Sequence, residues 1–318
     1  MVRSEFLCPS SDGHTLLHAA AWLPNGMDAV KTPKAVLQIA HGVAEHILRY
    51  EPLAEYLTDR GFVVTGNDHL GHGTSVPEGG VRLYMGPRGS WFRAVDDIES
   101  LRRRTKERFP AAPYFLLGHS MGSFLARTYL IRYPGALNGC ILMGTGQPSR
   151  ALLAAGRRVA EAECRRVGET KPSVLADRLA FGAYGKPFAP NRTSRDWLSV
   201  NEENVDRFLA SPLCGGTPAT GLLREMLDGM LYNSRLRNLR RMDPDTPVLF
   251  VSGAEDPVGD MGAGVRRAAA LFRRAGVWDM DVRLYPGLRH EILNEAPESR
   301  EQVMRDLAQW MNTACPSS

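Results

Sequence analysis

Short apolar runs alternate with longer amphipathic segments along most of the chain. This alternation is typical of βαβ units and predicts an α/β fold with a mostly parallel central sheet flanked by helices. Several of the short runs are continuously apolar, as strands buried on both faces should be. The expected strands are Ala35–Ala40, Phe62–Thr65, Tyr114–Leu117, Gly139–Met143, Val248–Val251 and Asp281–Tyr285.

The first residues follow a different pattern. Ser4–Cys8 and Thr15–Trp22 flank Ser11-Asp12-Gly13, which is a strong turn signal. We therefore expect an antiparallel hairpin at the edge of the sheet.

Amphipathic segments between the expected strands predict the helices that pack on the sheet. Gly61 and Gly276 stand where glycine would end two of them. Ser90 is the expected N-cap of another helix, and Pro297 suits the first turn of the last one. The expected helices are Glu51–Arg60, Ser90–Phe109, Met121–Tyr133, Ala263–Ala275 and Pro297–Asn312.

Residues 146–240 break this rhythm, because they lack strand-like runs and contain helical stretches interrupted by Gly and Pro. We expect a helical cap here, inserted between sheet strands and lying over their carboxyl ends. Residues 1–145 and 241–318 would then form the α/β core. The expected cap helices are Ala151–Val167, Val174–Phe181, Ser194–Val200, Asn204–Ser211 and Thr220–Arg237.

The charge of the chain is only mildly basic, with a formal net charge of +4. Its two arginine runs, at 102–104 and 235–241, alternate with apolar residues at helical spacing and are interpreted as solvated helix faces. We expect no nucleic-acid partner and at most weak peripheral contact with anionic membranes.

The cysteines favour a reducing compartment. There are five of them, widely spaced and without a C-x-x-C pair, which argues against a disulfide framework or a zinc site. Cys140 lies in an apolar run and is expected in the core. The N-terminus does not have the pattern of a secretory signal, and no run is apolar enough for a membrane span, so a cytoplasmic protein is expected.

The strongest chemical signal is Gly118-His119-Ser120-Met121-Gly122, which fits G-x-S-x-G between an expected strand and an expected helix. This context is that of a nucleophile elbow, a tight turn in which the flanking glycines avoid Cβ clashes. The serine is held at the end of the sheet, with a helix N-terminus behind it to favour negative charge. Ser120 is therefore the expected nucleophile.

A serine nucleophile needs a base, and the base needs an acid. Asp256 follows the expected strand Val248–Val251, and Glu255 and Asp260 are its rivals as the acid. His290 is the last histidine in the chain and again follows a strand. The order Ser, acid, His leaves it as the candidate base, with Asp256 holding its tautomer.

The oxyanion of the transition state needs two backbone N–H donors. One is expected from Met121, the residue after the nucleophile. The other is expected from Val43, in the loop His41-Gly42-Val43-Ala44-Glu45-His46 that follows the first parallel strand. His41 is expected to have a structural hydrogen-bonding role.

Asp68-His69-Leu70-Gly71-His72-Gly73 has the residue types of a zinc site. We favour a glycine-rich turn whose polar side chains fasten neighbouring loops, because no H-E-x-x-H pattern accompanies it. Neither a G-x-G-x-x-G nor a Walker motif is present, so neither a metal nor a nucleotide cofactor is expected.

Taken together, the motifs resemble those of the monoacylglycerol lipase and lysophospholipase branch of the α/β-hydrolases. The resemblance rests on the segments 41–46, 49–50, 68–73, 118–122, 256–259 and 289–291. It implies Ser120, Asp256 and His290 as the triad, Val43 and Met121 as oxyanion donors, and esters with one acyl chain as substrates. Ala44 departs from the family, which often has glycine there, and its methyl group would narrow the oxyanion loop.

We therefore expect a serine esterase or lipase that forms an acyl-enzyme on Ser120, acts on a small-molecule ester or lipid and uses no cofactor. Two alternatives remain: an acyltransferase that uses the same triad, and a binding module without turnover. Oligomeric state and physiological substrate are left open. Candidates to line an acyl pocket are Phe181, Phe188, Trp197, Phe208, Leu223 and Met230.

Overall fold

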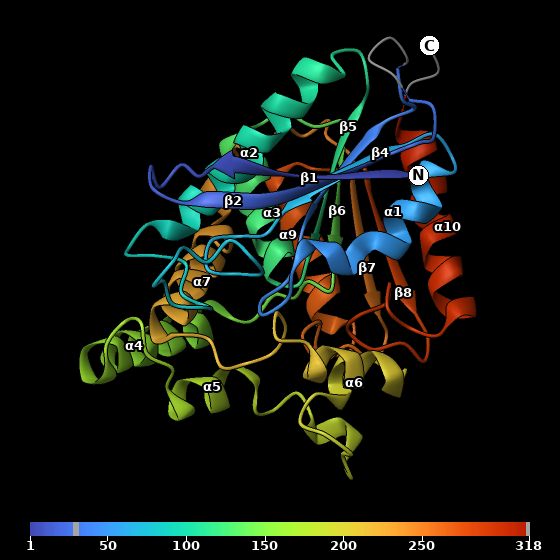
Figure 1. Ribbon diagram of the computed structural model, residues 1–318. Helices are drawn as coiled ribbons and strands as arrows, with labels where there is room; N and C mark the ends of the chain where they lie inside the picture. The colour runs from blue at the N-terminus through green and yellow to red at the C-terminus, as the bar shows by residue number, and fades with distance from the viewer. Residues whose placement is uncertain (28–31, 316–318) are drawn as a thin grey trace.

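The computed structural model describes residues 1–27 and 32–315. These residues form one eight-stranded sheet, in the order β1-β2-β4-β3-β5-β6-β7-β8 (Figure 1). The strands are β1 Val2–Pro9, β2 Leu16–Leu23, β3 Val36–Ala40, β4 Val63–Asn67, β5 Tyr114–His119, β6 Gly139–Met143, β7 Val248–Gly253 and β8 Met280–Tyr285.

The sheet is mostly parallel, as expected. β1 and β2 form the antiparallel hairpin, β2 also pairs antiparallel with β4, and the remaining neighbours pair parallel. β4 begins one residue later than expected, because the N–H of Phe62 still bonds to the carbonyl of Leu57 in the preceding helix. It runs on to Asn67, which pairs with Ala19 of β2.

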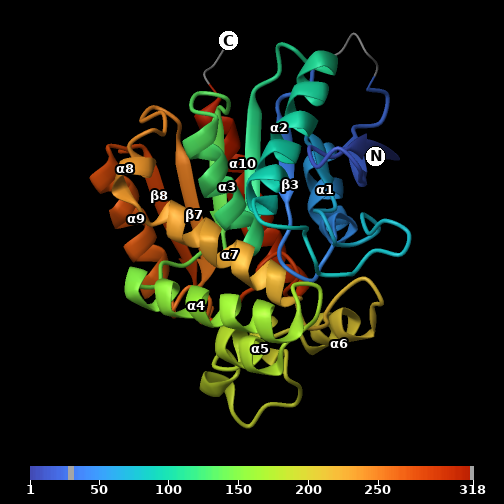
Figure 2. The ribbon, with the colours of Figure 1, turned by 90° about the vertical axis from the view of Figure 1, so that its left-hand side faces the viewer.

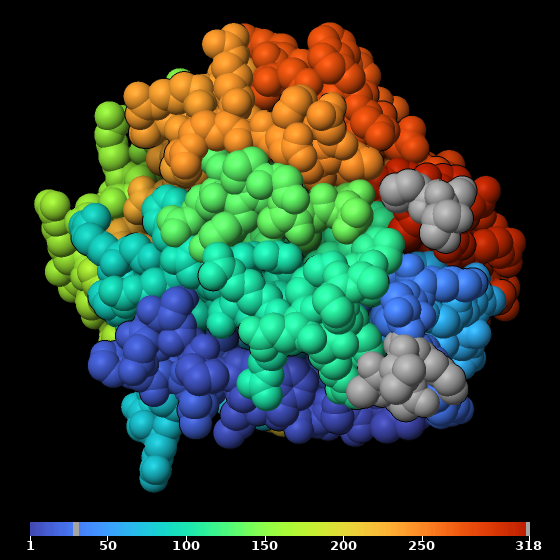
Figure 3. All heavy atoms as spheres, turned by 90° about the horizontal axis from the view of Figure 1, so that it is seen from above, coloured from blue at the N-terminus to red at the C-terminus, as the bar shows by residue number. Residues whose placement is uncertain are grey.

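Helices cover both faces of the sheet. α1 (Glu51–Thr58) and α10 (Pro297–Ala314) pack on one face, and α2 (Ser90–Arg108), α3 (Met121–Arg132) and α9 (Ala263–Ala275) pack on the other. Seen from above, the hairpin, α2, α3 and the C-terminal elements follow one another across the molecule (Figure 3). The strand order agrees with this, because it places the hairpin at one edge of the sheet and β7 and β8 at the other.

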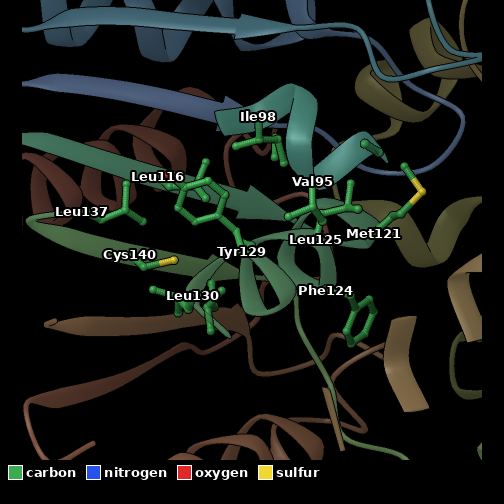
Figure 4. Packing of buried hydrophobic residues seen from close by; sticks show 14 of the residues in the cluster. Val95, Ile98, Leu116, Met121, Phe124, Leu125, Tyr129, Leu130, Leu137 and Cys140 are labelled. Atoms are coloured by element: carbon green, nitrogen blue, oxygen red, sulfur yellow. The ribbon is translucent and has the colours of Figure 1, made fainter. Parts of the chain in front are cut away.

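The larger core cluster lies between α2, α3 and the sheet (Figure 4). Leu125 and Tyr129 of α3 meet Ile98 of α2 and Leu116 of β5 there, and all four side chains are buried. Cys140 of β6 belongs to the same cluster and is fully buried, which confirms its expected place in the core.

Most expected helix ends are found, but the N-cap of α2 is not. Ser90 is already inside the helix, and the N-cap is Gly89, with φ +87°. The carboxylate of Glu225 accepts hydrogen bonds from the N–H groups of Gly89 and Trp91 instead, at 3.0 and 3.1 Å. A residue far along the chain thus replaces the local cap, which the sequence pattern alone does not reveal.

Helices fill the chain between β6 and β7. They are α4 (Arg150–Val167), α5 (Val174–Phe181), α6 (Glu202–Ala210), α7 (Thr220–Asn233) and α8 (Leu236–Leu239). Short 3₁₀ turns occur at η1 (Ile47–Tyr50), η2 (Lys186–Phe188) and η3 (Asp196–Leu198).

Two expected helices of this segment differ in the structure. The helix expected at Ser194–Val200 is only the turn η3, because the Asp196 carboxylate binds the N–H groups of Arg192 and Thr193 and holds a turn there. The helix expected at Thr220–Arg237 breaks in two near Ser234. The Ser234 hydroxyl donates to the Leu231 carbonyl, as a helix-ending residue does.

The helices of this segment differ in how deeply they lie. α7 lies across α3 and α4, with eight buried residues, whereas α5 lies at the outer end and buries only Ala176 (Figure 2). Within the described part of the chain, none of the helices combines the length and the apolar character that crossing a membrane requires.

Candidate active site

Ser120 occupies the turn between β5 and α3, at the carboxyl end of the central strand. Its backbone has φ +53° and ψ −118°, a region that side chains other than glycine rarely adopt. Its N–H donates to the carbonyl of Met143 on the neighbouring strand β6, at 2.9 Å. This conformation forms the tight turn after β5, and Ser120 is partly exposed there.

The two glycines of the motif are required by close backbone contacts. A Cβ on Gly118 would lie 2.2 Å from the carbonyl oxygen of Gly122. A Cβ on Gly122 would lie 1.9 Å from the carbonyl oxygen of Ala40 at the end of β3. The turn can therefore be this tight only with glycine at both positions.

Asp256 and His290 meet beyond the ends of β7 and β8. The Nδ1 atom of His290 lies 3.0 Å from both carboxylate oxygens of Asp256. The hydroxyl of Ser252 and the N–H of Val258 also donate to this carboxylate, each at 2.9 Å. Burial alone would raise the pKa of Asp256, but the charge and hydrogen bond of His290 and these donors lower it.

The ring of His290 is packed on two sides. The ring of His119 lies 4.8 Å from it and that of Trp197 lies 5.3 Å from it, centroid to centroid. A Cβ on Gly144 would lie 2.9 Å from Cε1 of His290, so the backbone there touches the ring edge. His290 and Ser120 line the same pocket, so the structure brings the expected nucleophile, acid and base together.

The rival acids lie elsewhere. Glu255 is exposed, and Asp260 is exposed and paired with Arg267 at 2.8 Å. Neither contacts His290 in the described structure, whereas Asp256 does so through both oxygens.

The loop after β3 lies beside the elbow because β3 and β5 are neighbouring parallel strands, with Ala40 opposite Gly118. Val43 of this loop lines the pocket beside Ser120, and its N–H makes no hydrogen bond to the described part of the chain. Met121 begins α3, where the first N–H groups of a helix have no partner within it.

Ala44 has a positive φ of +58° and also lines the pocket. Its carbonyl accepts a hydrogen bond from the N–H of Gly215 at 2.9 Å. The positive φ gives a physical reason for the glycine that the family often has here, because glycine adopts this conformation without strain.

A buried charge cluster behind the pocket was not assigned a role from sequence. The carboxylate of Glu45 accepts hydrogen bonds from the N–H of Gly42, from Tyr50 at 2.9 Å and from Arg49 at 2.8 Å. Arg49 also makes a bidentate pair with Glu291, with both distances 2.7 Å. The motif segments contained these residues, but only the fold shows that they meet, since Arg49 and Glu291 are far apart in the chain.

The groups of the cluster stabilise one another's charged forms. Burial alone would raise the pKa of Glu45, but the hydrogen bond of His119 and the charge of Arg49 hold it well below the ordinary range. Arg49 likewise lowers the pKa of Glu291 against the effect of burial. Burial alone would lower the pKa of Arg49, and the two carboxylates raise it well above its ordinary value. Asn204 of α6 donates to Glu291 at 2.7 Å, so the cluster also fastens the helical segment to the site.

His41 and the 68–73 segment have the structural roles expected of them. The Nδ1 atom of His41 bonds to the carbonyl of Gly42 at 2.7 Å, and its Nε2 atom accepts the N–H of His69 at 2.9 Å. Asp68 contacts His18 of β2 and the N–H of Ile47 at the start of η1, which joins the loop after β4 to both. Residues 1–27 and 32–315 hold no group of three or more His, Cys, Asp or Glu side chains arranged for a metal ion.

Three of the six candidate wall residues line the pocket, namely Phe181, Trp197 and Phe208. The other three do not. Phe188 packs under the guanidinium of Arg289, at 4.1 Å, and Met230 packs against the core. Leu223 is buried in α7, away from the pocket.

Comparison with known proteins agrees with this arrangement. A model of the Hydrolase_4 family, described as serine aminopeptidase S33, matches residues 31–297. The chain is 29% identical over 282 residues to monoacylglycerol lipase of Mycolicibacterium smegmatis, covering 88% of each chain. It is 27% identical over 305 residues to monoglyceride lipase of Homo sapiens, covering 95% of this chain and 88% of that one.

The fold is also similar to that of solved structures. A thermostable carboxyl esterase from Bacillus coagulans, in complex with glycerol, has a TM-score of 0.89 and 26% identity, and 99% of each chain is covered. The expected α/β-hydrolase fold is thereby confirmed. The chain belongs to the serine aminopeptidase S33 (Hydrolase_4) family and is a hydrolase of the α/β-hydrolase fold.

Proposed function

We propose that this protein hydrolyses carboxylic esters with one acyl chain through an acyl-enzyme on Ser120. The observation that carries the proposal is the placement of Ser120 and His290 on one pocket, with His290 held by both oxygens of Asp256. A monoacylglycerol or a lysophospholipid is a substrate of this kind.

In the proposed reaction, the Oγ atom of Ser120 attacks the ester carbonyl carbon while Nε2 of His290 takes its proton. The tetrahedral oxyanion accepts hydrogen bonds from the N–H groups of Val43 and Met121. The C–O bond to the alcohol then breaks, and the alcohol leaves with the proton from His290. Water, deprotonated by His290, hydrolyses the acyl-enzyme and regenerates Ser120.

The walls of the pocket favour an acyl chain. Phe181, Trp197, Leu198 and Phe208 line it from the helical segment. We propose that residues 146–240 act as the cap of residues 1–145 and 241–318, and that these apolar side chains hold the chain of the substrate. The relatives named as monoacylglycerol lipases and the carboxyl esterase support the same class of substrate.

The family description names an aminopeptidase, whose substrate has a positively charged amino group. A pocket for that group needs a carboxylate free to pair with it. The carboxylates that line this pocket are Glu45 and Glu291, and both are engaged by Arg49. This engagement favours an uncharged ester over a peptide N-terminus.

The location proposed for the protein is the cytoplasm. All five cysteines are unpaired, and four of them are buried, as in proteins of reducing compartments.

The proposal is tested with purified wild type and Ser120→Ala on p-nitrophenyl esters of increasing acyl length, 1-monoacylglycerol and lysophosphatidylcholine. We expect the variant to lose activity by about 10³-fold or more, because the nucleophile is gone. Ser100→Ala, on the exposed face of α2, is the matched control and should keep full activity.

Each result has a defined meaning. A wild type inactive on every ester, or a Ser120→Ala variant as active as wild type, would contradict the proposal. Transfer of the acyl group to added glycerol or methanol in preference to water would identify an acyltransferase. Cleavage of aminoacyl p-nitroanilides in preference to esters would identify an aminopeptidase.

A further inference from the structure

His119 precedes the nucleophile and has no part in the reaction proposed above, yet it lies at the centre of the site. It is buried, with 4% of its surface exposed. Its Nδ1 atom lies 3.0 Å from Oε1 of Glu45, and its Nε2 atom lies 3.3 Å from the carbonyl oxygen of His290. The side chain therefore bridges the oxyanion loop and the loop that carries the base.

Both groups that face the ring of His119 are hydrogen-bond acceptors. A neutral imidazole has one N–H, so one of its nitrogens would direct a lone pair at an oxygen. The doubly protonated ring donates to both the Glu45 carboxylate and the His290 carbonyl. The geometry is thus complementary to an imidazolium, because a buried acceptor left facing a lone pair is costly.

The charges around His119 also favour the positively charged imidazolium. Glu45 and Glu291 are two buried carboxylates, and Arg49 is the cation paired with both of them. A positive charge on His119 would balance the cluster at two positive and two negative groups. An unbalanced buried charge would be destabilising.

Other titratable groups also face this ring or the cluster. Burial alone would lower the pKa of His119, but the hydrogen bond and charge of Glu45 and the charge of Glu291 outweigh it and raise the pKa. The remaining groups around it are His290 against the ring face, Asp256 beyond His290, Tyr50 and His41.

We propose that His119 is a permanently charged positioning residue for the reaction of Ser120. As an imidazolium it donates its Nε2–H to the backbone carbonyl of His290 and so fixes the loop that carries the base. Its positive charge lies one ring away from the base, with 4.8 Å between the ring centroids of His119 and His290, and acts on the electrostatics of the site. The catalytic part of this inference rests on the proposed function.

The charge state is tested directly by NMR on full-length protein labelled with ¹⁵N-histidine, without reference to activity. We expect His119 to keep both ring nitrogens protonated above the pH at which an ordinary histidine loses its second ring proton. Its signals should be absent in His119→Gln, and this variant tells them apart from those of His18, whose ring nitrogens also face two carboxylates. In Glu45→Gln, which keeps an acceptor but loses the charge, the titration of His119 should move to lower pH.

A His119 that is neutral throughout the neutral pH range would overturn the proposal. The charge state is read from the wild-type protein, and the signals of His119 can also be assigned there through the contact of its ring with that of His290, so a misfolded variant does not prevent the assignment. The result is also independent of whether esters are the true substrates.

The effect on catalysis is tested with the pH profile of kcat/KM. In His119→Gln, loss of a cation that stacks on His290 should move the acid limb to higher pH by about one unit. His14→Gln, on the exposed turn of the β1–β2 hairpin, is the control and should leave the limb in place. A lower plateau with an unmoved acid limb would mean that His119 serves packing alone, and would contradict the electrostatic role.

Discussion

At the scale of single residues, the site depends on backbone positions where a side chain cannot fit. Ser120 adopts a strained conformation, and Gly118 and Gly122 approach other backbone atoms too closely for any Cβ. The strain is maintained because β5 and α3 are buried on all sides and fix the ends of the turn.

Gly122→Ala is therefore expected to damage both stability and activity. The new methyl group would overlap the carbonyl of Ala40, and relieving this overlap should lower the free energy of unfolding by about 2 kcal/mol or more. Urea unfolding and ester hydrolysis of the same preparation measure the two effects.

Gly156→Ala, in the middle of α4, is the matched control, because its Cβ would lie at an ordinary contact distance of 3.6 Å from Leu227 of α7. It should keep activity and gain up to about 1 kcal/mol from better helix propensity. A Gly122→Ala protein as stable as wild type would contradict the backbone contact described at the elbow.

At the scale of elements, buried polar side chains connect loops that the strands leave apart. Asp68, after β4, contacts His18 of β2 at 3.0 Å and accepts the N–H of Ile47 at 2.8 Å and that of Thr74 at 2.9 Å. Glu225 caps α2 from α7 in the same manner. The contacts of Asp68 with Ile47 and Thr74, and the cap of α2, fix the relative positions of segments that do not pair through the sheet.

The acid stability of the protein should depend on Asp68. Burial alone would raise its pKa, but the hydrogen bonds from His18, Ile47 and Thr74 lower it from 3.8 to about 2. A carboxylate with a lowered folded-state pKa stabilises the fold above its ordinary pKa, and this contribution is lost as the pH falls toward about 2. The contribution of ionised Asp68 to the free energy of unfolding is about 2 kcal/mol.

Urea unfolding at a series of pH values from about 5 down to about 2 measures this contribution of Asp68 to the free energy of unfolding. Wild type should lose stability steeply over the window, and Asp68→Asn should start less stable and show a flatter dependence. Parallel slopes for the two proteins would mean that Asp68 is not held ionised by these contacts.

At the scale of the whole molecule, the helices between β6 and β7 do not form a uniform layer. α7 packs against α2, α3 and α4, and its Asn233 side chain donates to the carbonyl of Phe124 in α3 at 2.8 Å. α5 buries a single residue and exposes Val174, Leu175 and Leu179. The inner helix is thus part of the same packed body as the sheet, and the outer one is not.

Hydrogen exchange should reproduce this difference. We expect the amides of α7 to exchange about as slowly as those of α3, because opening them requires disrupting the core, and those of α5 to exchange much faster. Mass spectrometry of peptides covering 121–132, 174–181 and 220–233 makes the comparison. Equal, fast exchange in α5 and α7 would indicate that the whole segment opens as one unit.

Local sequence patterns determined much of this protein. The alternation of apolar runs and amphipathic segments predicted the parallel sheet, its edge hairpin and most helices, since these depend on neighbouring residues. The G-x-S-x-G motif and the strand-end positions of Asp256 and His290 predicted which side chains would meet, because the carboxyl ends of parallel strands share one edge.

Only the tertiary structure decided the features that depend on residues far apart in the chain. The Glu225 cap of α2, the break after α7 and the true walls of the pocket belong to this class. So does the cluster of Glu45, Arg49, His119 and Glu291, because only the fold brings these side chains close enough to pair with one another. Hydrophobic periodicity carries no information on such pairings, since it reports which face of an element is buried and not which polar groups meet there.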